Sequence, residues 1–251
     1  MDAKATAVTV KEYPMTEKRA GQKADSAKIL KFQKEDGMTE TVEVNQSLAY
    51  RFIKRFFDIV ISLIGLIVLS PILIITIIAI RIEDHGPAFF TQNRIGKDKA
   101  VFKMYKFRSM KMNAAEIHEQ MKKDYGCDDI SFKLKKDPRV TKVGNFIRKT
   151  NIDELPQLIN ILIGNMSFVG PRPLPDYEFN DEQETFKGRY DARYAVPQGL
   201  TCIWQISNRS EPSFADRMQM DVDYSLKCGI GEDLKLFFQT FIYALVGKAA
   251  Y

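Results

Sequence analysis

The 251-residue chain has few of the side chains on which several common enzyme classes depend. It contains two histidines, His85 and His118, too far apart in sequence to favour a Ser-His-Asp triad or a histidine metal cage. Its three cysteines, Cys127, Cys202 and Cys228, form no CxxC pair, which disfavours a disulfide framework or zinc site and favours a reducing compartment. A GxxxxGK[ST] loop is absent, which disfavours a P-loop enzyme. Any chemistry therefore falls to carboxylates and basic residues.

The positive charges are concentrated in the middle of the chain, whose formal net charge is +5. Residues 1–47 carry eight basic and eight acidic side chains, residues 48–149 carry twenty and ten, and residues 150–251 carry nine and fourteen. The middle segment also holds the one long apolar run. Its positive surplus therefore favours anionic lipid headgroups or phosphorylated ligands over nucleic acid, for which no recognition motif is present.

The apolar run extends from Ile59 to Ile80, 22 residues without a charged side chain. It is long enough for about 33 Å of helix, and hydropathy alone favours an ordinary membrane span over a signal peptide. Basic residues flank both ends, however, so a span would leave one basic flank on the unfavourable side. Pro71 also removes a mid-run backbone hydrogen bond, and the Ser70 hydroxyl can satisfy the freed group. We therefore expect a kinked, re-entrant hairpin.

The regions around this run differ in composition and predict three parts. Residues 1–47 are polar and charge-balanced, which indicates a flexible N-terminal extension. Residues 48–82 predict an interfacial and re-entrant membrane helix, and residues 83–251 a mainly helical cytosolic catalytic domain. Within that domain, residues 85–110 predict a short β-hairpin with its turn at 96–99, although its basic residues alone fit an ordinary solvated hairpin. Residues 112–135 predict a helical excursion interrupted at Gly126, and the expected fold class is α+β.

The most informative stretch covers residues 137–173. Apolar residues repeat there at helical spacing and end at a glycine: Leu155, Leu158, Ile159, Leu162 and Gly164. Asn151 and Glu154 resemble a capping pair, and Pro156 is compatible with a first helical turn. Asp153 and Glu154 would then lie at a helix N-terminus. Capping the helix and complementing its dipole would by itself explain this pair.

Cations near the acidic pair indicate a second interpretation, phosphate chemistry. They are Arg139, Lys142, Arg148, Lys149 and Arg172. One carboxylate could attack phosphorus and form an aspartyl phosphate, while the other holds a Mg²⁺ ion that bridges a diphosphate. Arginines would neutralise charge on the phosphate oxygens and on the leaving nucleotide.

Several motifs in a fixed order resemble one known family. They are Ser70-Pro71, GPAFFTQNRIG, KFRSM, DPRVTKVGNFIRKTNIDELPQLINILIGNMSFVGPRP, RYAVPQGLTCIWQISNRS and DLKLFFQTFIYALVG. Over roughly residues 50–250 the chain resembles the bacterial sugar transferases, monotopic polyprenyl-phosphate phosphoglycosyl transferases. The resemblance implies transfer of a sugar 1-phosphate from a UDP-sugar to polyprenyl (undecaprenyl) phosphate, with release of UMP. It also implies a place on the cytoplasmic face of the bacterial inner membrane, at the first membrane step of exopolysaccharide, capsule, O-antigen or glycoprotein glycan assembly.

The same resemblance assigns roles by position. Asp153 matches the nucleophile and Glu154 its magnesium-associated partner. Residues that match phosphate or nucleotide contacts are Arg148, Pro171, Arg172 and Pro173, with Lys106 and Arg108 as further site members and Ser70 and Pro71 as the re-entrant break. The implied partners are polyprenyl phosphate, the nucleotide sugar and membrane lipids, with no nucleic acid, and a homo-oligomer is left open.

Two departures from the family pattern bear on the donor. Cys202 and Asn208 stand where members often have glycine, in a segment that we expect to touch the sugar or nucleotide. Residues 1–58 hold no apolar span of the kind that precedes the larger members, so the minimal form with an extension is expected.

Two other functions remain open at this point. A nonenzymatic membrane anchor would need only the apolar run and the basic surplus, but it leaves the pattern of residues 137–173 unexplained. A membrane nucleotide hydrolase would use water in place of polyprenyl phosphate as the acceptor.

Overall fold

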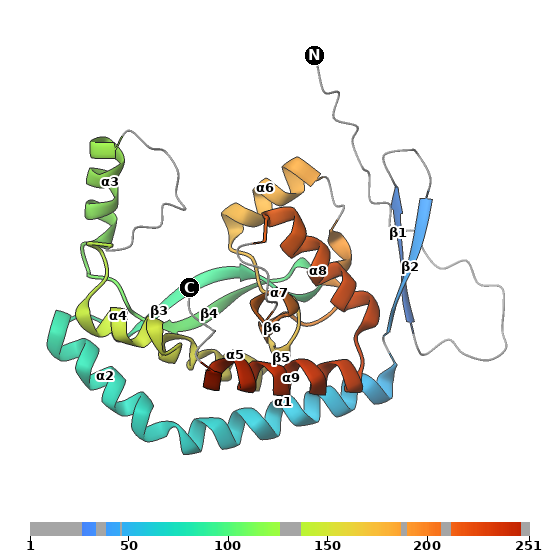
Figure 1. Ribbon diagram of the computed structural model, residues 1–251, viewed down its shortest axis with the longest axis horizontal. Coiled ribbons are helices and arrows are strands. Elements are labelled where there is room, and N and C mark those ends of the chain that lie inside the picture. The colour runs from blue at the N-terminus through green and yellow to red at the C-terminus, as the bar shows by residue number, and fades with distance from the viewer. Residues whose placement is uncertain are drawn as a thin grey trace, which may run out of the picture. The chain divides into compact units, whose positions relative to one another are not determined.

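A computed structural model describes residues 27–33, 39–45, 47–125, 137–186, 190–206 and 212–246. These residues form a mainly helical structure with three small two-stranded sheets, which confirms the expected α+β content (Figure 1). The chain divides into two compact units built from separate stretches. The first unit comprises Met1–Ile61, Asn93–Lys103 and Ile161–Ala249, and the second Ser62–Gln92, Met104–Asn160 and Ala250–Tyr251.

The first unit combines two of the small sheets with most of the C-terminal helices. Its elements are β1 (Ala27–Gln33), β2 (Thr39–Asn45), the start of α1 (Leu48–Val68), η1 (Lys97–Lys99), β5 (Ser167–Val169), α6 (Asp176–Phe186), η3 (Asp191–Tyr194), β6 (Gly199–Thr201), α7 (Ile203–Ile206), α8 (Phe214–Lys227) and α9 (Ile230–Val246). Strands β1 and β2 pair antiparallel within the segment 1–47, where the sequence predicts no strand. Strands β5 and β6 pair parallel.

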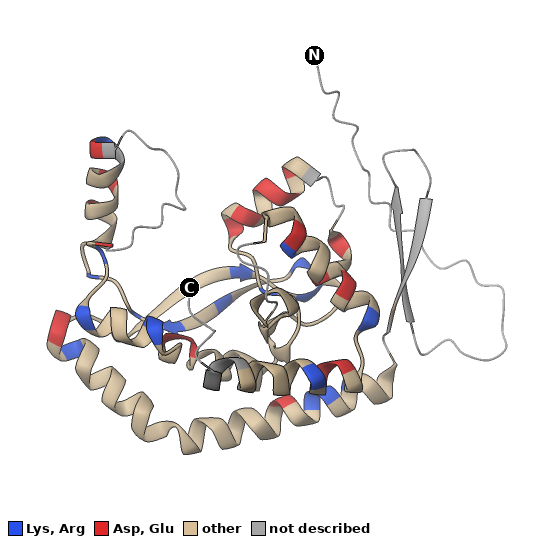
Figure 2. Ribbon diagram, viewed as in Figure 1, with Lys and Arg blue, Asp and Glu red and all other residues tan. Residues whose placement is uncertain are grey.

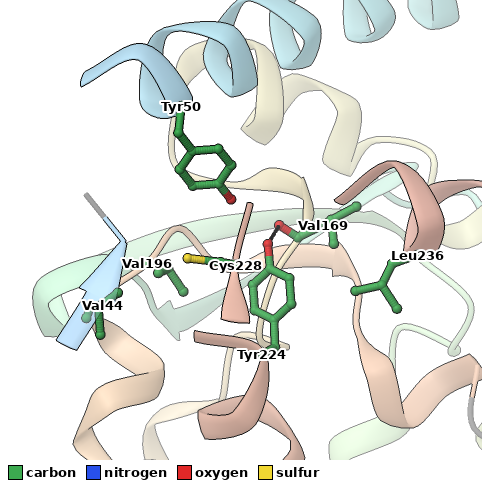
Figure 3. Packing of buried hydrophobic residues seen from close by; sticks show 8 residues of the cluster. Val44, Tyr50, Val169, Val196, Tyr224, Cys228 and Leu236 are labelled. Carbon is green, nitrogen blue, oxygen red and sulfur yellow. Dashed lines mark hydrogen bonds between the residues drawn. The ribbon is translucent and has the colours of Figure 1, made fainter. Parts of the chain in front are cut away.

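The apolar core of the first unit includes Tyr50, Val169 and Tyr224 (Figure 3), and polar side chains bind to these residues. Lys54 on α1 donates to Asp233 Oδ2 at 2.7 Å and to the Val169 carbonyl at 2.9 Å. The Tyr50 hydroxyl donates to the same carboxylate at 2.9 Å, and the Tyr224 hydroxyl donates to the Val169 carbonyl at 3.2 Å. These bonds fasten the start of α1 to α9 and to the end of β5.

Two further polar residues of α1 make hydrogen bonds to groups between Ile161 and Phe168. The Arg55 guanidinium donates to the carbonyls of Ile161 and Leu162, each at 2.6 Å. Asp58 accepts hydrogen bonds from the Ser167 hydroxyl and the Phe168 amide, both at 3.0 Å. These hydrogen bonds hold one side of the otherwise apolar helix α1. They also give partners to polar groups, which buried polar groups require.

The second unit contains the end of α1 and most of the segment with the acidic pair. Its elements are α2 (Ser70–Asp84), α3 (Ala114–Tyr125), α4 (Lys142–Lys149), η2 (Ile152–Glu154) and most of α5 (Gln157–Ile163), and the paired strands β3 (Phe89–Ile95) and β4 (Val101–Phe107) contribute to both units. The predicted hairpin is confirmed, and so is the part Ala114–Tyr125 of the helical excursion predicted over residues 112–135, whereas residues 126–135, with Gly126, lie outside the described residues. One core cluster of this unit contains Ile80, Ala88, Phe107 and Ile147, and it joins α2, the hairpin and α4.

The predicted kink at Ser70-Pro71 is present. Helices α1 and α2 meet at Leu69 with a bend of 60°. Because Pro71 has no amide hydrogen, the Ile67 carbonyl receives its hydrogen bond from the Ser70 hydroxyl, at 2.7 Å. Among the described residues, no single helix has the length and hydropathy of a membrane span, and only the bent pair α1 and α2 reaches them together. The pair carries no charged side chain from Ile59 to Ile80, and its charges lie before and after this stretch (Figure 2).

Helix α4 is fixed at its N-terminus by side chains from two directions. The Glu83 carboxylate, on the last turn of α2, accepts from the amides of Lys142 and Val143 at 2.7 and 2.9 Å. The Thr141 hydroxyl accepts from the Gly144 amide at 2.8 Å. A Cβ atom on Gly144 would overlap the carbonyl oxygen of Ser109. Glycine therefore permits the close approach of α4 to the segment after β4.

We expect the substitution Gly144→Ala to lower the free energy of unfolding by about 3 kcal/mol, because the added methyl would displace α4 from Ser109. Thermal unfolding of the detergent-solubilised protein measures the change. Gly231→Ala is the matched control, since a Cβ on this helical glycine meets no atom within 4 Å. The control should leave stability unchanged or raise it by up to about 1 kcal/mol. Equal stabilities of the two variants would contradict the close approach.

Candidate active site

The acidic pair Asp153 and Glu154 lies on the short turn η2 rather than on the first turn of an α-helix. Asn151 precedes it in the left-handed region, at φ 57°, and makes no side-chain capping bond, so the predicted capping pair of Asn151 and Glu154 is wrong. Asparagine tolerates this conformation, and it turns the chain sharply after α4. Helix α5 begins only at Gln157, after Pro156. Its predicted end is confirmed, because Gly164 follows it at φ 94°.

Glu154 is held by a lysine from the β-hairpin. The Lys106 ammonium on β4 lies 2.8 Å from Glu154 Oε1, and both side chains are largely buried. The strand itself is tied to α5, because the Tyr105 amide donates to Asn160 Oδ1 at 2.9 Å. The fully buried Asn160 interrupts an apolar helix. It fixes the register of β4 and hence the position of Lys106.

Arg148 enters the site from the last turn of α4. Its Nε atom donates to the Ser109 hydroxyl at 2.8 Å, which orients the guanidinium. The Ser109 carbonyl also accepts from the Thr141 amide, at 3.1 Å. Ser109 therefore contacts both ends of α4, a role that sequence reasoning missed although the residue lies within the KFRSM motif.

The electrostatics of Asp153 reflect these neighbours. Partial burial of its carboxyl raises the pKa of Asp153, and the negative charge of Glu154 raises it further. Lys106 and Arg148 act in the opposite direction and lower the pKa. The site thus contains a desolvated carboxylate next to a second one, with two cations that favour ionisation. Such a carboxylate is poorly solvated and is a suitable nucleophile toward phosphorus.

The other predicted cations of this unit have different partners. Arg139 makes hydrogen bonds to both carboxylate oxygens of Asp137, the shortest at 2.7 Å, and its Nη1 lies 2.9 Å from His118 Nδ1. Lys142 and Lys149 are exposed on α4. Of the basic residues that the sequence groups around the pair, only Arg148 is among the main groups that shift the pKa of Asp153.

Arg108 belongs to the same unit but contacts the end of α2. Its Nη1 donates to Asp84 Oδ2 at 2.8 Å, and its Nη2 donates to the Asp84 carbonyl at 3.0 Å. The Met112 amide donates to the same carboxylate at 2.9 Å. Arg108 thereby fixes the chain that carries Ser109.

The turn Pro171-Arg172-Pro173 lies in the first unit. Pro171 and Pro173 are buried, Arg172 is partly exposed, and its guanidinium carbon lies 5.9 Å from the ring centroid of Trp204. Cys202 is buried, and its Sγ lies 3.1 Å from Gln205 Oε1. Asn208, the other departure from the family pattern, lies outside the described residues.

The donor set of the acidic pair limits the kind of metal that fits. No group of three or more His, Cys, Asp or Glu side chains placed to hold a metal occurs among the residues that the structure describes. Asp153 and Glu154 offer two carboxylates, which suits Mg²⁺ ions that complete their coordination with water and substrate phosphates. The residues therefore fit a substrate-bridging Mg²⁺ and do not form an all-protein cage.

Comparison with known proteins gives matches over most of the chain. The family described as bacterial sugar transferase matches residues 49–247. A galactosyl transferase, CpsE of Streptococcus agalactiae serotype III, is 41% identical over 198 residues, which are 78% of this chain and 43% of that protein. An undecaprenyl-phosphate galactose phosphotransferase of Salmonella typhimurium is 39% identical over 208 residues, 80% of this chain and 42% of that protein. An exopolysaccharide production protein, ExoY of Sinorhizobium fredii, is 36% identical over 202 residues, 79% and 88% of the two chains.

The matched range contains Lys106, Arg148, Asp153 and Glu154. The chain spans less than half the length of the first two relatives and most of the length of the third. The extent of the family match and the identities to these proteins lead to one conclusion: the chain belongs to the bacterial sugar transferase family.

Proposed function

We propose that this chain transfers a sugar 1-phosphate from a nucleoside diphosphate sugar to polyprenyl phosphate. The observation that carries the proposal is the desolvated pair of Asp153 and Glu154 beside Lys106 and Arg148. The names of relatives support the acceptor and the pathway, since one is an undecaprenyl-phosphate phosphotransferase and another an exopolysaccharide production protein. We expect a UDP-sugar donor, UMP as the leaving product and a place at the first membrane step of glycan assembly.

The proposed reaction has two displacements at one phosphorus. A carboxylate oxygen of Asp153 attacks the sugar-linked phosphorus, the bond from that phosphorus to the bridging oxygen breaks, and the electron pair leaves with UMP. A phosphate oxygen of polyprenyl phosphate then attacks the aspartyl phosphosugar. The bond from phosphorus to Asp153 breaks, which restores the carboxylate and forms polyprenyl diphosphosugar.

The cations stabilise charge during these steps. Arg148, oriented by Ser109, would neutralise developing charge on phosphate oxygens, and Lys106, paired with Glu154, lowers the pKa of Asp153 and so favours its ionised form. Glu154 would hold Mg²⁺, which when bound neutralises charge on the donor diphosphate. For Arg172 with Pro171 and Pro173 we propose a contact with the nucleotide or its phosphates, supported by the sequence resemblance.

We further propose that α1 and α2 form a re-entrant hairpin in the cytoplasmic leaflet of the bacterial inner membrane. The bend at Leu69, the satisfied Ile67 carbonyl and the uncharged run support this placement. Large apolar side chains are exposed along both helices, including Phe52, Ile67 and Ile75 at 74%, 65% and 66%. Lipid would cover this apolar surface.

A covalent mechanism predicts a partial reaction with the donor alone. Wild-type protein given UDP-sugar and Mg²⁺ should release about one UMP per site and gain a sugar-phosphate mass on Asp153. Asp153→Asn removes the anionic nucleophile and should abolish both signals, while Asp124→Asn, an exposed carboxylate on α3, should retain them. Mass spectrometry and nucleotide analysis measure the two outcomes. Failure to trap either signal with a donor that turns over would exclude the covalent step.

The pKa of Asp153 predicts the acid limb of the activity profile. Because the nucleophile must be ionised, activity should fall as pH decreases through its raised pKa. Lys106→Met removes a charge that lowers this pKa, so the acid limb should move to higher pH, whereas Glu154→Gln should move it to lower pH. The exposed Lys111→Met is the control and should move neither.

Profiles of kcat/KM for the donor, measured from pH 4 to 9, test these shifts. All variants are compared on the same substrates, so ionisation of the substrates affects every profile equally. A shift of the same sign in Lys106→Met and Glu154→Gln would contradict the assignment of Asp153.

The re-entrant topology predicts that both flanks of the hairpin face the cytoplasm. Cysteines placed singly at Ala20 and Glu116, in a chain lacking Cys127, Cys202 and Cys228, should resist an impermeant thiol reagent in intact cells. Both should react after permeabilisation. Labelling of only one position in intact cells would demonstrate a full span.

A further inference from the structure

The turn that carries Arg172 is held by its backbone carbonyls. The Pro171 carbonyl accepts from the Gly199 amide at 2.8 Å, and the Pro173 carbonyl accepts from Arg94 Nη1 at 2.9 Å. Between them, the Arg172 carbonyl accepts from Arg193 Nη2 at 2.6 Å. The side chain of Arg172 does not contribute to these bonds, so the backbone is fixed independently of the guanidinium.

Arg193, which donates to the Arg172 carbonyl, belongs to a fully buried ion pair. Arg193, on η3, lies 2.7 Å from Asp221 Oδ2 on α8, and the two side chains are 0% and 1% exposed. Arg193 Nη1 also lies 3.0 Å from the Tyr194 hydroxyl. The Arg193 guanidinium therefore joins the Asp221 carboxylate to the backbone carbonyl of Arg172.

A buried ion pair adds little net stability to a core, because both charges must be desolvated. Withdrawing both charges from water costs several kcal/mol for each, and a pair of apolar side chains of similar volume often gives equal or greater stability. An apolar pair, however, has no donor for the Arg172 carbonyl. The guanidinium provides several fixed donors, of which one reaches Asp221 and Arg172 together.

The side chain of Arg172 makes a separate contact, with an aromatic ring. Its guanidinium lies over Trp204 on α7, and its charge lowers the pKa of the buried Cys202 thiol, although burial raises that pKa overall. Stacking on an aromatic face restricts the orientations that a guanidinium can take.

We propose that the Arg193–Asp221 ion pair is a positioning device for Arg172, which sets the place from which Arg172 contacts the phosphates of the donor. The inference rests on the proposed function, in which Arg172 binds the nucleotide part of the substrate. Arg193 and Asp221 are positioning residues, because they act through Arg172 and do not touch substrate.

A double-mutant cycle tests the proposal, with kcat/KM for the nucleotide sugar as the readout. Arg193→Lys keeps the charge next to Asp221, but a single ammonium cannot reproduce the forked contacts. It should lower kcat/KM about tenfold in the wild-type background, since small displacements of a binding group are costly. In an Arg172→Ala background the same change should alter kcat/KM less than about twofold, because the residue to be positioned is absent.

Ser225→Ala is the matched control. The buried Ser225 hydroxyl donates to the Asp221 carbonyl within α8 and does not touch Arg172. Its effect on kcat/KM should be the same in both backgrounds. Should Arg193→Lys unfold, the double replacement of Arg193→Met with Asp221→Leu removes both charges together and leaves none unpaired. It should show the same dependence on Arg172.

The outcomes separate two failures. Absence of sugar-phosphate transfer by the wild-type protein would refute the proposed function itself. Wild-type transfer combined with equal losses in the two backgrounds would overturn the positioning role alone, as would full activity of the Met and Leu replacement. Loss that depends on Arg172 would support it.

Discussion

The proximity of two adjacent carboxylates that are largely withdrawn from water is the constraint on which the second unit depends. Burial and the charge of Glu154 both raise the pKa of Asp153. Lys106 from the hairpin and Arg148 from α4 oppose this effect at Asp153. The positions of β4 and α4 therefore set the electrostatic surroundings of Asp153.

The surrounding structure fixes both elements by directional contacts. Buried Asn160 ties β4 to α5, while Glu83 and Thr141 hold the N-terminus of α4. Gly144 allows α4 to approach Ser109, whose hydroxyl orients Arg148. Since Glu83 lies on the last turn of α2, the element proposed to enter the membrane is bonded directly to the helix that carries Arg148.

The features that the sequence could predict follow from local backbone chemistry. Pro71 cannot continue the helical bonding pattern, the turn after β3 is rich in glycine and charge, and Gly164 ends α5. Partner choice was not predictable, because charge alone does not say which carboxylate a cation will meet. Arg108 pairs with Asp84 and Arg139 with Asp137, and both pairings depend on packing of distant segments or on turn geometry. The late start of α5 depends in the same way on the left-handed turn at Asn151.

The proposed reaction requires that phosphorus, and not the sugar carbon, is the centre attacked. A donor labelled at its sugar-linked phosphate, incubated with polyprenyl phosphate, Mg²⁺ and the protein in nanodiscs, tests this directly. We expect the label to move into the lipid product and the released nucleotide to be UMP. Release of labelled UDP with an unlabelled lipid would show glycosyl transfer and contradict attack at phosphorus.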